Sequence, residues 1–305
     1  MKIRLTLLAA LAACVACSQA PVLEEKANLS SPDGKLTLSF SLSEKGEPMY
    51  SLNYGDTPVV LPSRLGFELR GTVKATELDF KGTGITKKDS KPSYMFNSAF
   101  SVIGTENGSC DEVWNPVWGE EKSIRNNYNE LLVKLQQDGT ERRVNLRFRL
   151  FDDGLGFRYE FPGEQELNYF VIKEELSEFA MAGDHTAWWI PGDFDTQEYE
   201  YAETRLSGIS AELPAHVCGN SSQTLFSKSG VQTSMLMRTD DGLYISIHEA
   251  ALNNYSCMHL DVDEKSLVLR SFLTPDAQGW KGYMQAPCNT PWRTVQVTDS
   301  AEKML

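Results

Sequence analysis

Apolar and polar residues alternate one by one in several stretches of this chain. The clearest alternation occupies residues 36–42, 144–150, 155–161 and 243–247. Side chains of a β-strand point alternately to its two faces, so each stretch has one face for a core and one for solvent. Parallel sheets, which are buried on both faces, would give unbroken apolar runs instead. The pattern therefore favours antiparallel sheets that keep one face in solvent.

Turn-forming dipeptides lie beside or between these stretches. Asn-Gly and Asp-Gly favour tight hairpin turns because both central residues can take positive φ. We expect one hairpin over residues 143–161, built on Asp152-Asp153-Gly154, and a second over residues 232–249, built on Asp240-Asp241-Gly242. The dipeptides occur at Asp33-Gly34, Asn107-Gly108, Asp138-Gly139, Asp153-Gly154 and Asp241-Gly242.

The whole pattern predicts an all-β fold, a large antiparallel β-sandwich over residues 28–298. A dozen or more short strands, with no convincing amphipathic helix between them, are typical of that architecture. Weaker strand candidates lie at residues 49–54, 65–70, 131–136, 170–175, 266–273 and 292–298. Residues 112–130 and 183–224 mix Trp, Pro, Gly and Asn without any period, so we expect long functional loops there.

The first 20 residues have the pattern of a secretory signal, which predicts export. Lys2 and Arg4 precede an apolar run that is too short to span a bilayer. Two cleavage sites remain open: one after Ala20, and one at a lipobox-like Leu11-Ala12-Ala13-Cys14 that would place a lipid anchor on Cys14. We expect a periplasmic or outer-membrane-anchored protein of a Gram-negative bacterium without a transmembrane helix.

Charge and cysteine content narrow the function further. The formal net charge of −13 repels phosphate backbones, which argues against a nucleic-acid partner. Outside the export signal, four cysteines are widely spaced and form no C-x-x-C pair, which argues against a zinc site. A domain of this size needs no disulfides, so buried free thiols are expected, with disulfide pairing left open. These residues are Cys110, Cys218, Cys257 and Cys288.

The densest polar and aromatic cluster occupies residues 183–205. Aromatic faces can stack on sugar rings, while carboxylates bind hydroxyls or a hard cation. An EF-hand starting at Asp193 is excluded, because its sixth residue is Glu198 rather than Gly and its twelfth is Thr204 rather than Glu. Nucleophile-elbow, zinc-helix, Walker and Rossmann motifs are absent from the sequence. The cluster comprises Asp184, Asp193, Asp195, Glu198, Glu200 and Glu203 among Trp188, Trp189, Tyr199 and Tyr201.

Three runs of sequence resemble the N-terminal domain of glycoside hydrolase family 97. They are residues 186–201 (TAWWIPGDFDTQEYEY), 232–252 (QTSMLMRTDDGLYISIHEAAL) and 291–297 (PWRTVQV). The family includes a periplasmic α-glucosidase of the Bacteroides starch-utilisation system. The resemblance implies a galactose-mutarotase-like supersandwich followed by a catalytic (β/α)8 barrel, so residues 299–305 would begin the linker to that barrel. Both catalytic carboxylates would then lie beyond Leu305, and this chain alone would be inactive.

The resemblance also implies a Ca2+ ion held mostly by barrel glutamates. One glutamate of the N-terminal domain completes that site, and the matching position is Glu198, with Glu200 as the second choice. Substrate contacts near this loop would fall on Asn220, Ser221, Ser222 and Gln223, for which a structural turn is the competing interpretation. The expected substrate is an α-linked oligosaccharide, with α-glucosidase preferred over α-galactosidase activity. A free-standing carbohydrate-binding module of a surface or periplasmic protein is the alternative.

Overall fold

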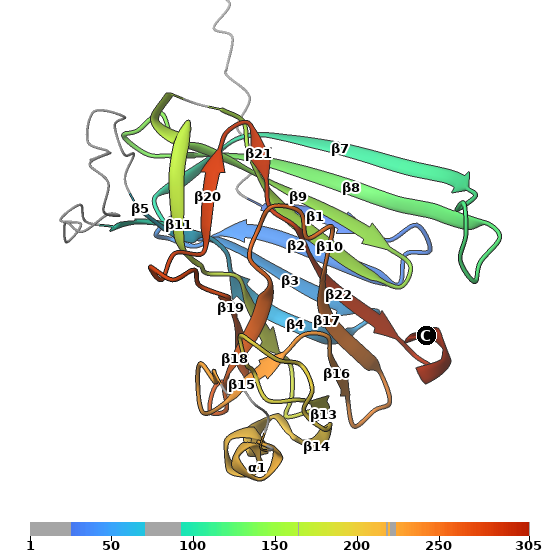
Figure 1. Cartoon of the computed structure of the whole chain (residues 1–305). Coiled ribbons are helices and arrows are strands. Elements are labelled where there is room, and N and C mark those ends of the chain that lie inside the picture. Colours follow the sequence, from blue (N-terminus) through green and yellow to red (C-terminus); the bar gives the residue numbers. More distant parts are fainter. Residues whose placement is uncertain (1–25, 71–92, 164, 218, 220–223, 305) are drawn as a thin grey trace, which may run out of the picture.

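The structure, a computed structural model, describes residues 26–70, 93–163, 165–217, 219 and 224–304. Within these ranges the chain is dominated by antiparallel strands arranged in three sheets, which confirms the predicted all-β sandwich (Figure 1). Residues 1–20, which carry the predicted export signal, lie outside the described ranges. None of the helices in the described ranges has the length and hydropathy needed to cross a bilayer.

The first sheet has eight strands. Leu36, Leu38 and Phe40 all point to its buried face, as their alternation predicts. Across the sheet the strands are β1 (Lys26–Ser30), β2 (Leu36–Leu42), β3 (Pro48–Tyr54), β4 (Thr57–Arg64), β12 (Glu178–Met181), β19 (Val268–Leu273), β18 (Met258–Asp263) and β15 (Gly230–Gln232).

The second sheet has ten strands and contains both predicted hairpins. Phe151 pairs with Gly154 across the turn of the first hairpin, and Arg238 pairs with Tyr244 in the second. In order the strands are β14 (Ala202–Arg205), β13 (Thr186–Trp189), β16 (Met235–Arg238), β17 (Tyr244–Ala250), β22 (Trp292–Thr298), β10 (Gly154–Phe161), β9 (Arg143–Phe151), β8 (Ile124–Gln137) and β7 (Phe100–Trp114), with β21 (Cys288–Asn289) beside β10.

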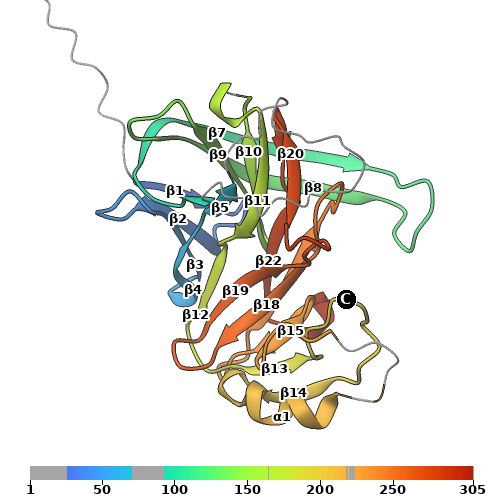
Figure 2. The same cartoon turned by 60° about the vertical axis from the view of Figure 1, so that its left-hand side comes forward.

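A four-stranded sheet and short helices complete the architecture. Its strands are β20 (Gly282–Gln285), β11 (Tyr169–Glu175), β5 (Phe67–Arg70) and β6 (Ser93–Phe96). The helix α1 (Ile209–His216) lies beside β14 at one end of the molecule (Figure 2). The 3-10 helices are η2 (Gln165–Leu167), η3 (Leu206–Gly208) and η4 (Ala301–Met304).

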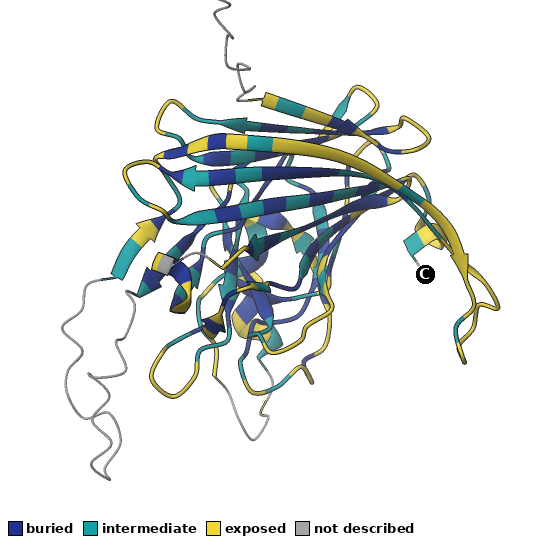
Figure 3. Cartoon of the chain, turned by 90° about the horizontal axis from the view of Figure 1, so that it is seen from above, coloured by how far each residue is buried: buried dark blue, intermediate teal, exposed yellow. Residues whose placement is uncertain are grey.

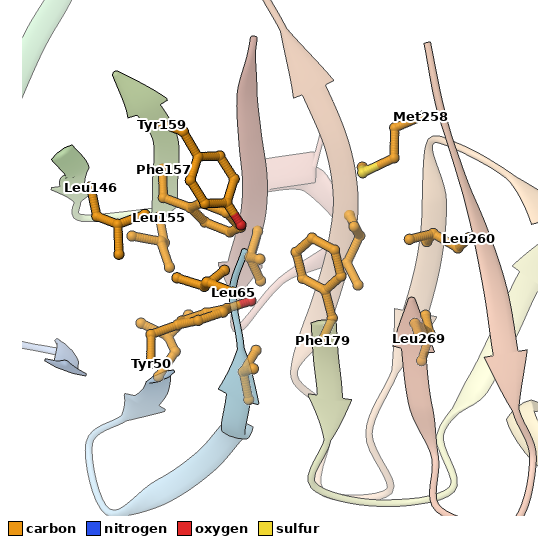
Figure 4. Close-up of a cluster of buried hydrophobic side chains, with 14 of the residues drawn as sticks. Tyr50, Leu65, Leu146, Leu155, Phe157, Tyr159, Phe179, Met258, Leu260 and Leu269 are labelled. Atoms are coloured by element: carbon orange, nitrogen blue, oxygen red, sulfur yellow. The ribbon is translucent and has the colours of Figure 1, made fainter. Parts of the chain in front are cut away.

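The core lies between the inner faces of the two large sheets (Figure 4). Rings from opposite sheets pack together: Phe40 lies 6.1 Å from Phe148, and Tyr50 lies 5.2 Å from Phe157, between centroids. Fully burying one such aromatic side chain contributes about 1.5–3 kcal/mol. The outward faces of the two sheets are thereby left to carry polar and functional groups.

A buried ion network joins the ten-stranded sheet to the four-stranded sheet. Arg293 of β22 donates two hydrogen bonds to Glu175, at 2.8 and 2.7 Å, and one to Glu249 of β17, at 2.5 Å. Ser177 and Tyr255 also donate to the Glu175 carboxylate, each at 2.8 Å. Burial alone would raise the pKa of Glu175, but Arg293 and the two hydroxyls hold it below its ordinary value. The side chains of Arg293 and Glu175 are both fully shielded from solvent, so the charge of each is stabilised by the other rather than by water.

Two local predictions are wrong in the same region. Asn107-Gly108 forms no turn but lies inside β7, where Asn107 pairs with Leu131. Residues 112–130 are also not one long loop, because β7 continues to Trp114 and β8 begins at Ile124. The strands here have no buried face over much of their length, so their sequence carries no alternation (Figure 3). Long-range pairing with β8 overrides the local turn preference of Asn-Gly.

The cysteines in the described ranges are free, as expected. Cys110, Cys257 and Cys288 are half-buried rather than fully buried. Cys218 lies outside the described residues. Burial raises the pKa of the Cys288 thiol to about 11, which keeps it protonated and unreactive at neutral pH.

Candidate functional site

The predicted polar and aromatic cluster of residues 183–205 is not one continuous loop but comprises β13, β14 and, between them, a loop over residues 190–201, which we call the Glu198 loop. It follows β13 and returns into β14, so both of its ends belong to one hairpin of the ten-stranded sheet. Two isolated bridges, Pro191 with Val231 and Asp193 with Leu225, attach it to the segment that leads into β15. The loop therefore lies where the ends of the two large sheets meet.

A single buried carboxylate organises this loop. Asp193 is only 2% exposed. One of its oxygens accepts hydrogen bonds from the backbone amides of Asp195, at 2.8 Å, and Thr196, at 3.3 Å. The other accepts from the Tyr199 hydroxyl, at 2.9 Å, and the Thr224 amide, at 2.7 Å. A carboxylate with four donors remains stable in a buried position because each lone pair is used.

The backbone carbonyl of Asp193 is held as firmly as its side chain. The Gln232 amide donates to it at 2.8 Å, and His259 Nε2 contacts it at 3.0 Å. Gln232 also donates to the carbonyl of Thr196, at 3.1 Å. Since a carbonyl only accepts, His259 must carry its proton on Nε2, and burial lowers the pKa of this ring so that it stays neutral. His259 is thus a hydrogen-bonded structural histidine.

Behind the loop, three phenylalanine rings pack against one another in a triangular cluster on the outer face of the eight-stranded sheet. Between centroids, the Phe226 ring lies 5.4 Å from Phe194 and 4.5 Å from Phe272, and Phe194 lies 6.0 Å from Phe272. Gly192 and Gly230 cover Phe226 so closely that an added Cβ would lie 2.4 and 2.5 Å from its ring atoms. This cluster anchors the Glu198 loop through Phe194, which belongs to the loop. Only glycine fits at positions 192 and 230, because any Cβ there would overlap the Phe226 ring.

Alternation along the end of the loop presents two glutamates to solvent. Tyr199 points inward to Asp193, while Glu198 and Glu200 on either side of it are exposed. The amide of Glu198 donates to Thr196 Oγ1 at 3.2 Å, which fixes its backbone. Within the described residues no hydrogen bond or ion pair engages its carboxylate. Glu198 is therefore a free carboxylate on a tightly held backbone.

The other acids of the predicted cluster have structural partners. Asp184 accepts hydrogen bonds from the amide and hydroxyl of Ser207, at 2.9 and 2.7 Å. Glu203 accepts from the indole of Trp188, at 2.9 Å. Thr224 donates its hydroxyl to Asp195. These groups stabilise the hairpin and its connections, so they are not brought together as a site.

Two other members of the cluster differ in exposure. Trp189 is fully buried and belongs to the core, whereas Tyr201 is 65% exposed beside Glu200. The four predicted substrate contacts, Asn220, Ser221, Ser222 and Gln223, lie outside the described residues.

The donor set suits calcium only in part. Calcium takes six to eight oxygen ligands, and an exposed carboxylate such as Glu198 is a suitable donor. In the described part of the chain, no group of three or more His, Cys, Asp or Glu side chains could hold a metal ion. The described residues can thus contribute a ligand to a shared site but do not form a complete one.

A separate hollow of about 330 Å3 opens near the ends of β4, β12 and β19. Its acids include Glu174, whose pKa is raised by burial, and Glu178, whose pKa falls below its ordinary value through its pairing with Arg64 despite burial. Phe272 borders it, but the ring is already covered by Phe226 on one side and by the Lys281 ammonium, 4.3 Å from its centroid. The hollow lacks a free aromatic face on which a sugar could stack.

Sequence reasoning missed the residues that hold the loop. Gln232 and His259 lie on neighbouring strands, β15 and β18, and face each other in register. The local signal was that Gln232 and His259 are polar residues next to apolar ones in their own strands. Their joint role depends on strand pairing, which the sequence does not report.

Comparison with known proteins identifies the family. The family model described as Glycosyl-hydrolase 97 N-terminal matches residues 29–305. The chain belongs to this family. The resemblance carried by residues 186–201, 232–252 and 291–297 is thereby confirmed, and the Glu198 loop lies within the first of these three runs.

Relatives of this family 97 chain are much longer proteins. The retaining alpha-galactosidase of Bacteroides thetaiotaomicron is 23% identical over 307 residues, which cover 93% of this chain and 40% of that protein. A family 97 enzyme from Pseudoalteromonas sp. strain K8, solved with acarbose, is 30% identical with a TM-score of 0.71, covering 90% of this chain and 36% of that one. A variant of an enzyme from the same strain, solved with panose, gives the same identity and TM-score. The family 97 chain thus spans 36–40% of the length of these relatives.

Proposed function

We propose that this chain is the non-catalytic N-terminal part of a larger exported α-glycosidase, in which it completes the active site. The observation that carries the proposal is the match of residues 29–305 to an N-terminal family, while relatives are more than twice as long. In this proposal a catalytic barrel follows the sandwich and supplies both reacting carboxylates. Export is proposed from the signal pattern of residues 1–20.

The Glu198 loop supports a role at the edge of such an active site. Its backbone is fixed by Asp193, Gln232 and His259, while the exposed Glu198 carboxylate has no partner among the residues that the structure describes. Because the loop is already ordered, it loses little conformational entropy when Glu198 binds a cation. Little of the binding free energy is therefore offset by ordering the loop. Glu198 would serve as one oxygen ligand of a Ca2+ ion that is shared with the barrel. When bound there, the ion would orient sugar hydroxyls and stabilise the charges of nearby carboxylates.

Replacing Glu198 with glutamine in the full-length enzyme should raise the calcium concentration needed for half-maximal binding by about 10–100-fold, in line with the loss of a supporting group at metal sites. The carboxamide keeps the size of the side chain but loses the charge that attracts the cation. Isothermal titration of calcium into metal-free enzyme would measure this shift without relying on activity. Glu200→Gln is the matched control, being an equally exposed glutamate two residues away. An unchanged titration for Glu198→Gln would exclude it as a ligand, and a shift for Glu200→Gln alone would transfer the role to that residue.

For the substrate we propose an α-linked glucose oligosaccharide rather than a galactoside. Support comes from the 30% identity to the Pseudoalteromonas enzyme, whose relative was solved with panose, a glucose trisaccharide. Identity to the retaining alpha-galactosidase is lower, at 23%. The Glu198 loop itself does not distinguish the two sugars, because the proposed specificity groups lie in the barrel.

Assays on nitrophenyl α-glucoside and α-galactoside should find no turnover by the 305-residue chain and turnover by the full-length enzyme, faster on the glucoside. The reason is that the chain would lack both catalytic carboxylates. A glycosidase normally accelerates hydrolysis by a factor of at least about 10⁶, so the contrast is unambiguous. Clear turnover by the 305-residue chain would overturn the proposed division of labour.

A carbohydrate-binding module is the second candidate, favoured by the exposed ring of Tyr201 beside the Glu198 loop. Titration of the 305-residue chain with maltooligosaccharides separates the two functions. Micromolar binding would support a module, whereas half of a shared pocket should bind these sugars only weakly.

A further inference from the structure

The hairpin of β7 and β8 extends well beyond the rest of its sheet. The two strands pair along their whole length, from Phe100 with Gln137 to Trp114 with Ile124. The next strand, β9, covers β8 only over residues 129–136. Residues 110–128, which we call the distal ribbon, therefore project as two strands without a third (Figure 3).

The distal ribbon has little to stabilise it as it stands. A two-stranded hairpin is at best marginally stable in water unless another layer covers it. Arg125 forms a double hydrogen bond with Asp111, at 2.8 and 2.9 Å, and Asn126 donates to Glu112 at 2.9 Å. These pairs are largely solvent-exposed and contribute little to stability, and only Tyr128, at the base of the ribbon, packs its ring on the sandwich, 5.2 Å from that of Phe151. An ordered ribbon of this length is consistent with a partner that packs against it.

The tip of the ribbon carries the side chains such a partner would bury. Trp118 is 90% exposed and Trp114 is 49% exposed, within a few residues of each other. Exposed tryptophans close together are typical of the centres of protein interfaces, where they contribute most of the binding energy. The apolar residues exposed at the tip are Val113, Trp114, Val117, Trp118 and Ile124.

The path of the chain points to the occupant. The last described residues, Ala301–Met304, leave the sandwich on the side toward which the ribbon projects, in both views (Figures 1 and 3). A domain that follows Leu305 would therefore start on the same side of the sandwich as this arm. A second copy of the chain is disfavoured, because it would bring together two chains of net charge −13, and the tip, with Glu120, Glu121 and Lys122, does not offset that repulsion.

We propose that the distal ribbon is a docking arm that packs its two tryptophans on the catalytic domain following residue 305. The inference rests on the proposed function. The receiving surface would be an apolar depression with basic groups at its rim, which complements the acidic flanks of the tip. The arm would then fix the orientation of the two domains at a point separate from the Glu198 loop.

Hydroxyl-radical footprinting of the full-length enzyme tests this arm. Tyr283 of β20, which is 57% exposed, serves as the internal reference. We expect Trp118 to be oxidised more slowly than Tyr283, at every protein concentration, although in the free arm it is the more exposed ring. Oxidation of Trp118 at or above the rate of Tyr283 would overturn the proposal. Protection that disappears on dilution would also overturn it, in favour of a second copy.

A variant gives an independent readout. Val117→Ser combined with Trp118→Ser should shift the docking equilibrium by about 30-fold toward the undocked arm, which is the effect of removing one interface hot spot. Trp114 should then become oxidised faster, whereas Leu61→Ser, at a 41% exposed site on β4, should leave it unchanged. Unchanged protection of Trp114 in the double variant would contradict the arm. Failure of the full-length protein to hydrolyse glycosides would instead refute the proposed function, and the footprint would still report docking.

Discussion

Replacing Arg293 with methionine should lower the free energy of unfolding by about 3–5 kcal/mol, because breaking a buried pair leaves an uncompensated charge. Two carboxylates, Glu175 and Glu249, would then face each other in the core without a cation. Methionine fills much of the volume of the lost side chain, so the effect reports charge rather than a cavity. Urea denaturation of the two proteins measures the difference.

The pH dependence of this variant should have the opposite sign to that of the wild type. In the wild type the folded-state pKa of Glu175 lies below its ordinary value, so its contribution is present above the unfolded pKa of about 4.3 and is lost as the pH falls through the folded pKa. Without Arg293, burial would raise the folded-state pKa of this carboxyl. Its protonation would then favour the folded variant, whose stability should rise as the pH falls.

Two controls separate this effect from a general loss of charge. Arg125→Met removes an arginine whose partner Asp111 is exposed, and it should change stability little. Arg293→Met combined with Glu175→Gln removes one of the stranded charges and should recover part of the loss. A loss below about 1 kcal/mol for Arg293→Met, the level of an exposed pair, would contradict the assigned role of the network.

Replacing Asp193 with alanine should release the Glu198 loop while leaving the sandwich folded. Four donors, from Asp195, Thr196, Tyr199 and Thr224, would lose their acceptor. Leaving buried donors unpaired costs about 1–3 kcal/mol, and here the cost is confined to a loop that can open locally. Hydrogen exchange at the amides of Thr196 and Thr224 should accelerate by about 10-fold or more, which corresponds to 1.4 kcal/mol of local stability.

The same variant connects the fold to the proposed function. Calcium binding by the full-length enzyme should weaken even though the Glu198 carboxylate is intact, because its backbone would no longer be fixed. Asp193→Asn is the matched control: it keeps one acceptor oxygen and the side-chain volume, and it should have a smaller effect on exchange. Unchanged exchange in Asp193→Ala would show that Gln232 and His259 hold the loop without the carboxylate.

The sequence by itself determined which residues face the core and which family the chain belongs to. Alternation in residues 36–42 and 144–150 records burial of one strand face, and that burial is present in the structure. The hairpin of residues 143–161 turns at Asp152-Asp153, as predicted. There the turn preference of the sequence and the apolar alternation of the two flanking strands are compatible with the same pairing. Glu198 was selected from a motif, and the structure adds that its side chain is exposed on a fixed loop.

Only the tertiary structure decided how distant groups meet. Arg293 lies two residues before the buried Val295, so the alternation of β22 predicts that its side chain faces the core. Its partner Glu175, however, lies 118 residues away in the chain. His259 and Gln232 reach Asp193 only because β15 pairs with β18. The distal part of the β7–β8 hairpin was not predicted, because strands that bury few side chains leave no periodic signal. Local sequence encodes the direction of a side chain, whereas its partner is fixed by contacts between remote strands.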